Sequence, residues 1–345
     1  MEGISIQMES STKKNKSAHL IEDAKEKCSS NQINKTMLYG DFLFYWLDCY
    51  VQPSSKLRTY VHYKGIIELH IKPKLGNLWL SEITPFVIQP YINKLLISGN
   101  LRTGGGLSPN SVNSVISILK NTLKVAYSLG LTNEYIGDKI RRPKQNEKRV
   151  ECFSRNEQKK LEQYILDDEK LKYFGIVLCL YTGLRIGELL ALEWTDISME
   201  ENEINVSKSC HYGKDKYGIY QRITEPPKTK SSIRKIPIPK QLMPYLLTLK
   251  NKSHSTHVVS NGIKLISTRS YQNSFSLLLK RLDLPMRGFH SLRHTFATRA
   301  LECGMDAKTL SEILGHKTLT ITLNRYAHSL TEHKKEMMNN LGNLL

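Results

Sequence analysis

The sequence predicts a mainly α-helical protein with a small antiparallel β-sheet, an α+β chain with two domains. Residues 36–137 carry apolar side chains three and four positions apart, as on one face of a helix, without a strand pattern. Residues 203–239 contain short β-like runs separated by turn residues. Helical spacing then returns near residue 290 and continues to Tyr326. With 345 residues, the chain is long enough to build two hydrophobic cores.

Four helices are expected in the first domain. They span residues 37–51, 57–71, 84–97 and 108–130. We expect Pro73 to stop the second helix. The fourth has the clearest boundaries, because Ser108 can cap it, Pro109 suits the first helical position and Gly130 suits the position beyond its end. Four helices without strands predict a small helical bundle.

Composition shifts divide the chain further. The expected segments are a polar arm with at most one short helix, a helical domain, a basic linker, a mixed α/β domain and a tail, at 1–35, 36–137, 138–150, 151–328 and 329–345. The linker is charged and interrupted by Pro143, so it is either a solvated connector or a segment that crosses a DNA backbone.

In the second domain, Ser154 and Glu157 have the spacing of a capping box at the start of a helix. Buried helices are expected over 171–182 and 185–192, and the strands follow. Three helices end the domain, over 291–302, over 306–314 with Gly315 beyond its end, and around Tyr326.

The charge of the chain indicates a polyanionic partner. Fifty Lys and Arg against 32 Asp and Glu give a formal net charge of +18. Basic side chains that neutralise phosphates release counterions, which dominates affinity for nucleic acid. The alternative is a protein that is merely basic. The N-terminus lacks the apolar region of a signal peptide, and the longest apolar stretch, 175–184, is too short to span a bilayer. We therefore expect a cytoplasmic protein with no membrane partner.

Five residues in the order Arg, His, Arg, His, Tyr suggest phosphodiester chemistry. Arg185 and Arg293 are candidates for binding phosphate oxygens, because a guanidinium binds two oxygens at once and stays charged. Arg185 opens a predicted helix, whose N-terminal N–H groups can assist, and Glu188 can orient it. The alternative for Arg185 is a surface salt bridge with Glu188.

His290 lies three residues before Arg293, so the two share a helical face if the helix begins by residue 290. His294 and His290 form the rival pattern of a metal pair, but no Glu stands between them, and no Cys-x-x-Cys occurs in the chain. We expect no metal and assign His294 to packing or support. Tyr326 is the candidate nucleophile, and its alternative is a buried core tyrosine.

The segment 226–235 is a basic turn between two predicted strands. Lys228 or Lys230 at its tip can reach a DNA groove and protonate a leaving oxygen. The alternative is an exposed hairpin lysine.

These motifs, taken together, resemble the tyrosine recombinases of the phage integrase type. The matching segments are T-G-L-R-I-G-E-L, P-K-T-K-S-S-I-R-K-I-P-I, F-H-S-L-R-H-T-F-A-T and L-G-H-K-T-L-T-I-T-L-N-R-Y-A-H. Residues 151–345 resemble the catalytic domain of this family. The helical domain, with H-I-K-P-K-L-G at 70–76, resembles its SAM-like core-binding domain.

The resemblance implies a role for each matching residue. Arg185 and Arg293 would clamp the scissile phosphate, with Glu188 in support, and His316 would donate a hydrogen bond to it. His290 would assist acid–base chemistry, Lys228 would be the general acid, and Tyr326 would form a 3′-phosphotyrosyl link. The ester conserves the bond energy, so no cofactor is expected.

The resemblance further implies a site-specific recombinase in a bacterial cytoplasm. It would act as a homotetramer on two double-stranded DNA sites, pass through a Holliday junction and integrate or excise a mobile element. An accessory DNA-bending or excisionase protein would assist, and the tail would pack on a neighbouring subunit or on its own domain. Only about 35 residues precede the helical domain, so we do not expect the additional arm-binding domain of larger transposon integrases.

Two alternatives to recombination stay open. A relaxing enzyme like the type IB topoisomerases would share the cleavage chemistry. A DNA-binding regulator, or an inactive integrase, would agree with the similarity of residues 306–326 to a helix-turn-helix.

Overall fold

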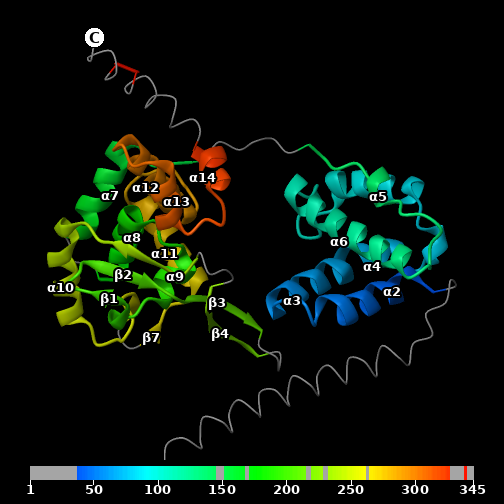
Figure 1. The fold of residues 1–345 in the computed structure, drawn as a ribbon, viewed down its shortest axis with the longest axis horizontal. Helices are drawn as coiled ribbons and strands as arrows, with labels where there is room; N and C mark the ends of the chain where they lie inside the picture. The colour runs from blue at the N-terminus through cyan, green and yellow to red at the C-terminus, as the bar shows by residue number, and fades with distance from the viewer. Residues whose placement is uncertain are drawn as a thin grey trace, which may run out of the picture. The chain divides into compact units, whose positions relative to one another are not determined.

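The computed structural model describes residues 37–144, 151–167, 171–214, 219–227, 232–261, 264–326 and 338–339. The predicted N-terminal arm, residues 145–150 of the linker, Lys228, Lys230 and most of the tail lie outside the described residues. The chain divides into two compact units, Met1–Glu147 and Lys148–Leu345, and each is described by itself (Figure 1).

The described part of unit 1 is helical. Its α-helices are α2 (Tyr39–Trp46), α3 (Leu57–Ile66), α4 (Lys72–Leu75), α5 (Pro85–Ser98) and α6 (Pro109–Ser128). The predicted ends of α6 are confirmed, because the Ser108 hydroxyl accepts a hydrogen bond from the Ser111 N–H and Gly130 has φ +71°. The core joins α2 to α6, where the buried hydroxyls of Tyr39 and Thr122 lie 2.7 Å apart.

The expectation that Pro73 stops the second helix is wrong. The helical path continues through a π-turn, Ile67–Ile71, into α4. Lys72 donates its N–H to the Ile67 carbonyl, five residues back, and Pro73 then stands in the first turn of α4. Prolines are tolerated in the first turn of a helical segment, and Pro73 has this place in α4, directly after the π-turn.

Unit 2 is mixed. Its helices are α7 (Arg155–Asp167), α8 (Leu171–Thr182), α9 (Ile186–Ala191), α10 (Met243–Lys252), α11 (Thr268–Arg281), α12 (His290–Glu302), α13 (Ala307–Leu314) and α14 (Leu319–Tyr326). The capping box before α7 is confirmed, with Ser154 N to Glu157 Oε2 at 2.7 Å and Glu157 N to Ser154 Oγ at 3.2 Å. α10 and α11 lie in a stretch for which the sequence analysis assigned no element.

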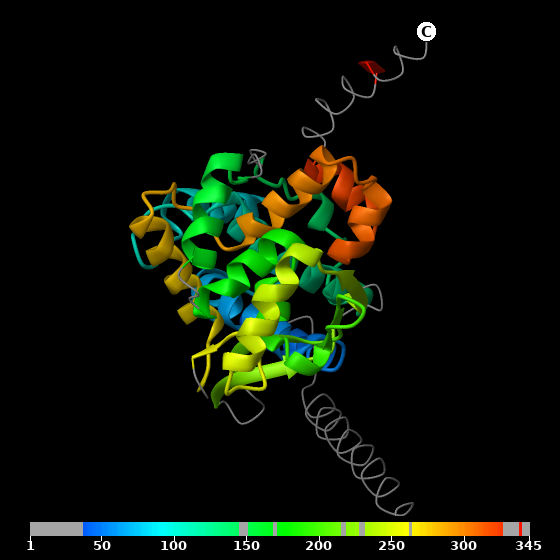
Figure 2. The ribbon, with the colours of Figure 1, turned by 90° about the vertical axis from the view of Figure 1, so that its left-hand side faces the viewer.

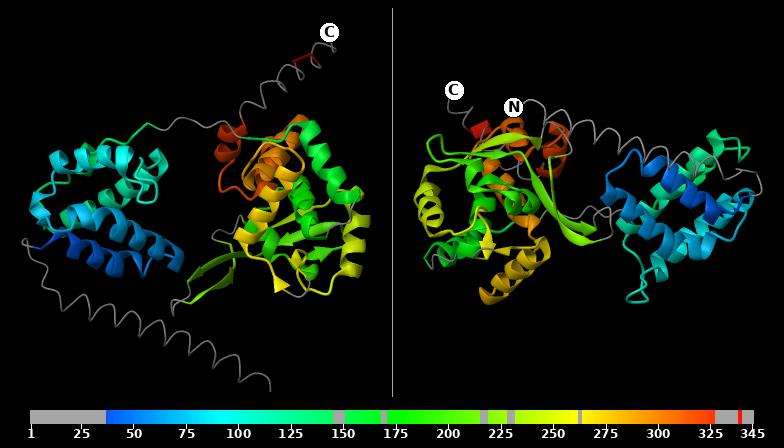
Figure 3. Two further views of the ribbon diagram at one scale, coloured as in Figure 1. Left: turned by 180° about the vertical axis from the view of Figure 1, so that it is seen from behind. Right: turned by 90° about the horizontal axis from the view of Figure 1, so that it is seen from below.

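The described strands form three small antiparallel sheets rather than one. Strands β1 (Ile197–Ser198), β2 (Glu203–Val206) and β5 (Arg234–Pro237) pair in the order β1-β2-β5. Strands β3 (Ser209–Lys214) and β4 (Tyr220–Glu225) form a hairpin that projects from the rest of unit 2 (Figure 3). Strands β6 (Ser260–Asn261) and β7 (Lys264–Leu265) form the third. Ile204 pairs with Ile236, both buried, so the first sheet turns an apolar side to the core.

The core of unit 2 surrounds α8, which packs along α12. A smaller cluster joins the last three helices of the described ranges, α12, α13 and α14, drawn in orange and red in Figure 2. It contains Ala297, Leu301, Leu310, Leu314 and Tyr326, so the predicted nucleophile is held against the helix that carries Arg293. Among the described residues, no helix is long and apolar enough to cross a membrane.

Candidate active site

The turn between α8 and α9 forms the floor of the candidate site. Gly183 stands in it with φ +65°, a conformation that L side chains rarely adopt. A β-carbon at this position would lie 2.6 Å from Cδ1 of Phe296 and 2.8 Å from Cδ2 of Leu314. Glycine therefore allows α12 and the end of α13 to approach the turn closely.

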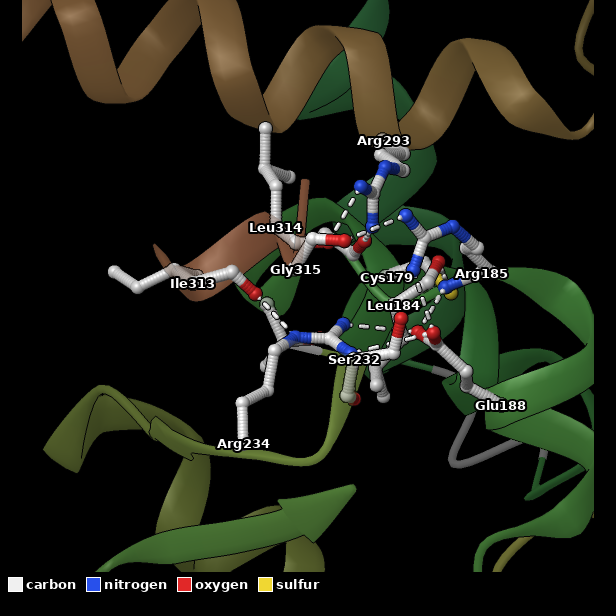
Figure 4. A network of polar contacts seen from close by, with 12 residues as sticks. Cys179, Leu184, Arg185, Glu188, Ser232, Arg234, Arg293, Ile313, Leu314 and Gly315 are labelled. Carbon is white, nitrogen blue, oxygen red and sulfur yellow. Dashed lines mark hydrogen bonds and ion pairs between the residues drawn. The ribbon is translucent and has the colours of Figure 1, made fainter. Parts of the chain in front are cut away.

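Arg293 crosses this junction from α12. Its Nη1 donates to the Gly183 carbonyl at 2.8 Å. Its Nη2 donates to the Leu314 carbonyl at 2.6 Å (Figure 4). The side chain is buried, with 2% of its surface exposed. Two carbonyls from distant segments thus fix the direction of a buried cation.

Arg185 is the residue directly before α9. It contacts α9 through Glu188 and the end of α13 through Gly315. Its Nη1 lies 2.7 Å from Oε1 of Glu188, and its Nη2 donates to the Gly315 carbonyl at 3.1 Å. Its backbone N–H donates to Oε2 of Glu188 at 3.0 Å. We expected the N–H groups at the start of this short helix to assist phosphate binding. For the Arg185 N–H this expectation is wrong, because that N–H donates to the Glu188 carboxylate. The pair is not a surface salt bridge either, because Glu188 is buried.

Arg234, on β5, is a member of this network that the sequence analysis did not single out. It binds Glu188 twice, with Nη2 to Oε2 at 2.9 Å and Nη1 to Oε1 at 3.2 Å. Its Nε donates to the Ile313 carbonyl at 2.5 Å. Figure 4 shows Glu188 between the guanidinium groups of Arg185 and Arg234. The sequence signal that could have identified Arg234 is a basic residue at a buried position of a strand, in I-R-K-I-P.

The charges act strongly on one another. Burial raises the pKa of Glu188, but the hydrogen bond and charge of Arg234, with the charge of Arg185, lower it to about 2. Burial, followed by the charges of Arg185 and Arg234, lowers the pKa of Arg293 to about 9, while Glu188 and Tyr326 act in the opposite direction. At neutral pH the network therefore contains three arginine cations and one carboxylate, an excess of positive charge suited to a phosphate.

The end of α13 brings His316 to the same region. Gly315 has φ +62°, and a β-carbon there would lie 3.1 Å from Cδ of Arg234. His316 follows, and its Nδ1 lies 2.7 Å from the hydroxyl of Thr322, which is buried in α14. The carbonyl of Gly315, the residue before His316, accepts a hydrogen bond from Arg185. His316 therefore lies next in the chain to a residue that Arg185 binds.

Tyr326 ends α14 and is 2% exposed. Its hydroxyl lies 2.8 Å from Nδ1 of His294, and the two rings meet at 61° with their centroids 5.9 Å apart. The ring of His290, at the start of α12, lies 4.6 Å from that of His294 in an edge-to-face contact. His294 therefore contacts the predicted nucleophile directly, which the sequence analysis did not foresee.

The described residues thus bring together Arg185, Glu188 and Arg293 in one network, and link His290 to Tyr326 through His294. Lys228 lies outside them. Within the described ranges, no group of three or more His, Cys, Asp or Glu side chains is arranged to hold a metal ion. The arrangement suits transfer of a phosphoryl group to a phenol, because buried cations stabilise the charge that develops on the phosphate oxygens.

Comparisons with known proteins agree with this chemistry. The model of the phage integrase family matches residues 143–333, and the model of the phage integrase N-terminal SAM-like domain matches residues 38–96. A tyrosine recombinase XerC-like protein of Caldanaerobacter subterraneus subsp. tengcongensis is 32% identical over 339 residues, covering 88% of this chain and 83% of its own. The ICEBs1 integrase of Bacillus subtilis is 29% identical over 307 residues, covering 84% and 79%.

The fold agrees with solved structures as well. The Tn1549 transposon integrase, in complex with a circular intermediate DNA, superposes with a TM-score of 0.75 at 21% identity. The match covers 88% of this chain and 99% of that one. The likeness therefore includes both the helical part and the mixed part of the chain.

Proposed function

This chain belongs to the phage integrase family of tyrosine recombinases and is a site-specific DNA recombinase, and we propose that it cleaves DNA by attack of the Tyr326 hydroxyl on a phosphodiester bound by Arg185 and Arg293. The observation that carries this proposal is the network around Glu188. It includes two guanidinium groups held in fixed directions, that of Arg185 by Glu188 and that of Arg293 by the carbonyls of Gly183 and Leu314.

Arg185 and Arg293 have the physical properties of a phosphate clamp. The transition state of phosphoryl transfer to a phenol carries more negative charge on its equatorial oxygens than the substrate does. Donors that are already oriented stabilise this charge without reorganising, and each contributes a few kcal/mol to the rate. Glu188 and the carbonyls of Gly183, Leu314 and Gly315 supply the orientation.

The covalent step conserves energy. Tyr326 bonds to the phosphorus as the bond to the 5′ oxygen breaks, which leaves a 3′-phosphotyrosyl ester and a 5′ hydroxyl. A 5′ hydroxyl from the partner duplex then attacks the ester and releases the tyrosine. Two such rounds exchange both pairs of strands through a Holliday junction, without a metal or a nucleotide cofactor.

The other matching residues complete the reaction. Lys228 protonates the departing 5′ oxygen, and His290 assists proton transfer. His316 donates a hydrogen bond to a phosphate oxygen, and its bond to Thr322 supports this role by fixing the ring. Both domains bind the phosphates of the duplex through basic side chains. They are the helical domain 36–137 and the catalytic domain 151–328, which the basic linker 138–150 joins in sequence.

Stoichiometry supports a tetramer. Two duplexes that exchange strands contain four cleavage points, and each chain contributes one Tyr326. Four copies on DNA, with the tail of each copy on a neighbour, therefore form the active assembly in a bacterial cytoplasm. An accessory DNA-bending or excisionase protein sets the balance between integration and excision of the mobile element.

Two assays test the proposal. With a nicked suicide substrate, the wild type should form a covalent protein–DNA adduct and Tyr326→Phe should not. A two-site strand-exchange assay should join ends from different duplexes, whereas a relaxing enzyme would only change the linking number of a plasmid. Binding without adduct would indicate a regulator. An adduct with Tyr326→Phe would show that another residue is the nucleophile.

A further inference from the structure

The contact between His294 and Tyr326 has a chemical consequence. Nδ1 of His294 lies 2.8 Å from the phenolic oxygen, within hydrogen-bond distance. A neutral imidazole whose proton is on Nε2 accepts a hydrogen bond at Nδ1, so a phenol in this contact donates its proton toward the ring. In this tautomer the contact joins a base to the one proton that the nucleophile must lose.

The phenol of Tyr326 needs a base at the moment of attack. A phenol is mostly protonated at neutral pH, because its ordinary pKa is about 10, and burial disfavours the free phenolate. The loss of the proton must accordingly be concerted with attack, and a base already in contact lowers that barrier. Among the described contacts of the phenolic oxygen, His294 provides this base, whereas His290 contacts the ring of His294.

We propose that His294 accepts the phenolic proton of Tyr326 during strand cleavage and returns it during strand joining. This inference rests on the proposed role of Tyr326. As the bond from the phenolic oxygen to phosphorus forms, the bond from phosphorus to the 5′ oxygen breaks. The phenolic proton moves to Nδ1 of His294, and the 5′ oxygen takes a proton from the general acid. In the reverse reaction the imidazolium gives the proton back to the departing phenol.

His294→Asn tests this role, because the asparagine carboxamide can keep an acceptor near Nδ1 but does not take up a proton at neutral pH. We expect single-turnover cleavage of a suicide substrate to slow about 10²- to 10⁴-fold, with DNA affinity unchanged. The matched control is His254→Asn, the same change at an exposed histidine of unit 2, which should cleave at the wild-type rate.

Fluorotyrosine at position 326 separates proton transfer from simple positioning. Its phenol is more acidic, so it depends less on a base. The ratio of the wild-type rate to the His294→Asn rate should therefore fall at least tenfold when position 326 holds fluorotyrosine. The proposal would be overturned if this ratio did not fall, or if His294→Asn cleaved as fast as the wild type or faster. It would also be overturned if fluorotyrosine restored the rate of His290→Asn rather than that of His294→Asn.

A measurement on the unaltered chain protects against misfolding of the variant. In ¹⁵N NMR spectra of the imidazole groups, Nδ1 of His294 should show the shift of an unprotonated nitrogen that accepts a hydrogen bond, and Tyr326→Phe should remove that bond. A proton on Nδ1 of the neutral ring would contradict the proposal. If the wild type forms no Tyr326 adduct, the proposed function fails; if the adduct forms normally with His294→Asn, only this inference fails.

Discussion

Arg234 and Glu188 form a buried ion pair with two contacts, Nη2 to Oε2 at 2.9 Å and Nη1 to Oε1 at 3.2 Å. The same carboxylate holds Arg185 at 2.7 Å. Arg234 therefore keeps Glu188 ionised and directed at the guanidinium that we expect to bind the phosphate. Since Arg234 also binds the Ile313 carbonyl, it connects β5 to the end of α13, two residues before Gly315.

Arg234→Met should weaken both folding and cleavage. The substitution leaves a buried carboxylate with one cation fewer, and breaking a buried pair costs about 3–5 kcal/mol. Urea unfolding of unit 2 and the rate of covalent adduct formation measure the two effects. Lys235→Met is the matched control on the same strand. Lys235 pairs with Glu201 and Glu203 at the surface, so its loss should leave the free energy of unfolding almost unchanged. Equal effects of the two variants would contradict the role of Arg234.

Glu188 should make the stability depend on acid pH. Its folded pKa of about 2 is below the ordinary value of 4.5, so its contribution is complete above pH 4.5 and is lost as the pH falls through 2. The shift corresponds to a stabilisation on the order of 3 kcal/mol. In urea unfolding at a series of pH values, the wild type should therefore lose more stability between pH 6 and pH 2 than Glu188→Gln does. Parallel curves for the two proteins would show that the carboxylate is not held in this way.

Gly183→Ala should disturb the floor of the site more than its conformation alone explains. A left-handed backbone costs an alanine about 1–2 kcal/mol, and the β-carbon would also overlap Phe296 and Leu314. Gly304→Ala is the control, because Gly304 has φ +87° and nothing within 4 Å of an added β-carbon. We expect a larger drop in the unfolding midpoint for Gly183→Ala, together with slower cleavage. A smaller drop than that of Gly304→Ala would contradict the close approach at Gly183.

Lys228→Ala should slow cleavage of an ordinary phosphodiester much more than cleavage of a 5′-bridging phosphorothiolate. The sulfur leaving group needs no proton, so the loss of a general acid matters little there. Rate constants for adduct formation on the two substrates give the comparison. Equal defects on both substrates would remove Lys228 from the acid role and direct attention to Lys230.

The sequence predicted much of the fold because its signals are local. Ser108, Gly130 and the capping box at Ser154 act within one turn of helix, and their effect is confirmed. The prediction from Pro73 was wrong, because a proline after a π-turn can stand at the start of a new helical segment instead of ending one. The division of the strands into separate small sheets depends on which strands meet, and spacing within a strand does not contain that information.

The candidate site was predictable in its members but not in its contacts. Arg185 and Arg293 stood out by motif, and the structure brings them into one network with Glu188. Arg234 did not stand out, and His294 was assigned only to packing or support, because their contacts are with partners 46 and 32 residues away along the chain. Such pairings depend on tertiary packing, which leaves no periodic trace in the sequence.

Identification of the residue joined to DNA tests the central claim most directly. The wild-type adduct trapped on a suicide substrate is digested with nuclease and protease, and the peptide that retains a nucleotide is sequenced by mass spectrometry. We predict a nucleotide linked through its 3′ phosphate to the phenolic oxygen of Tyr326. A nucleotide on any other residue, or a link through the 5′ phosphate, would contradict the account.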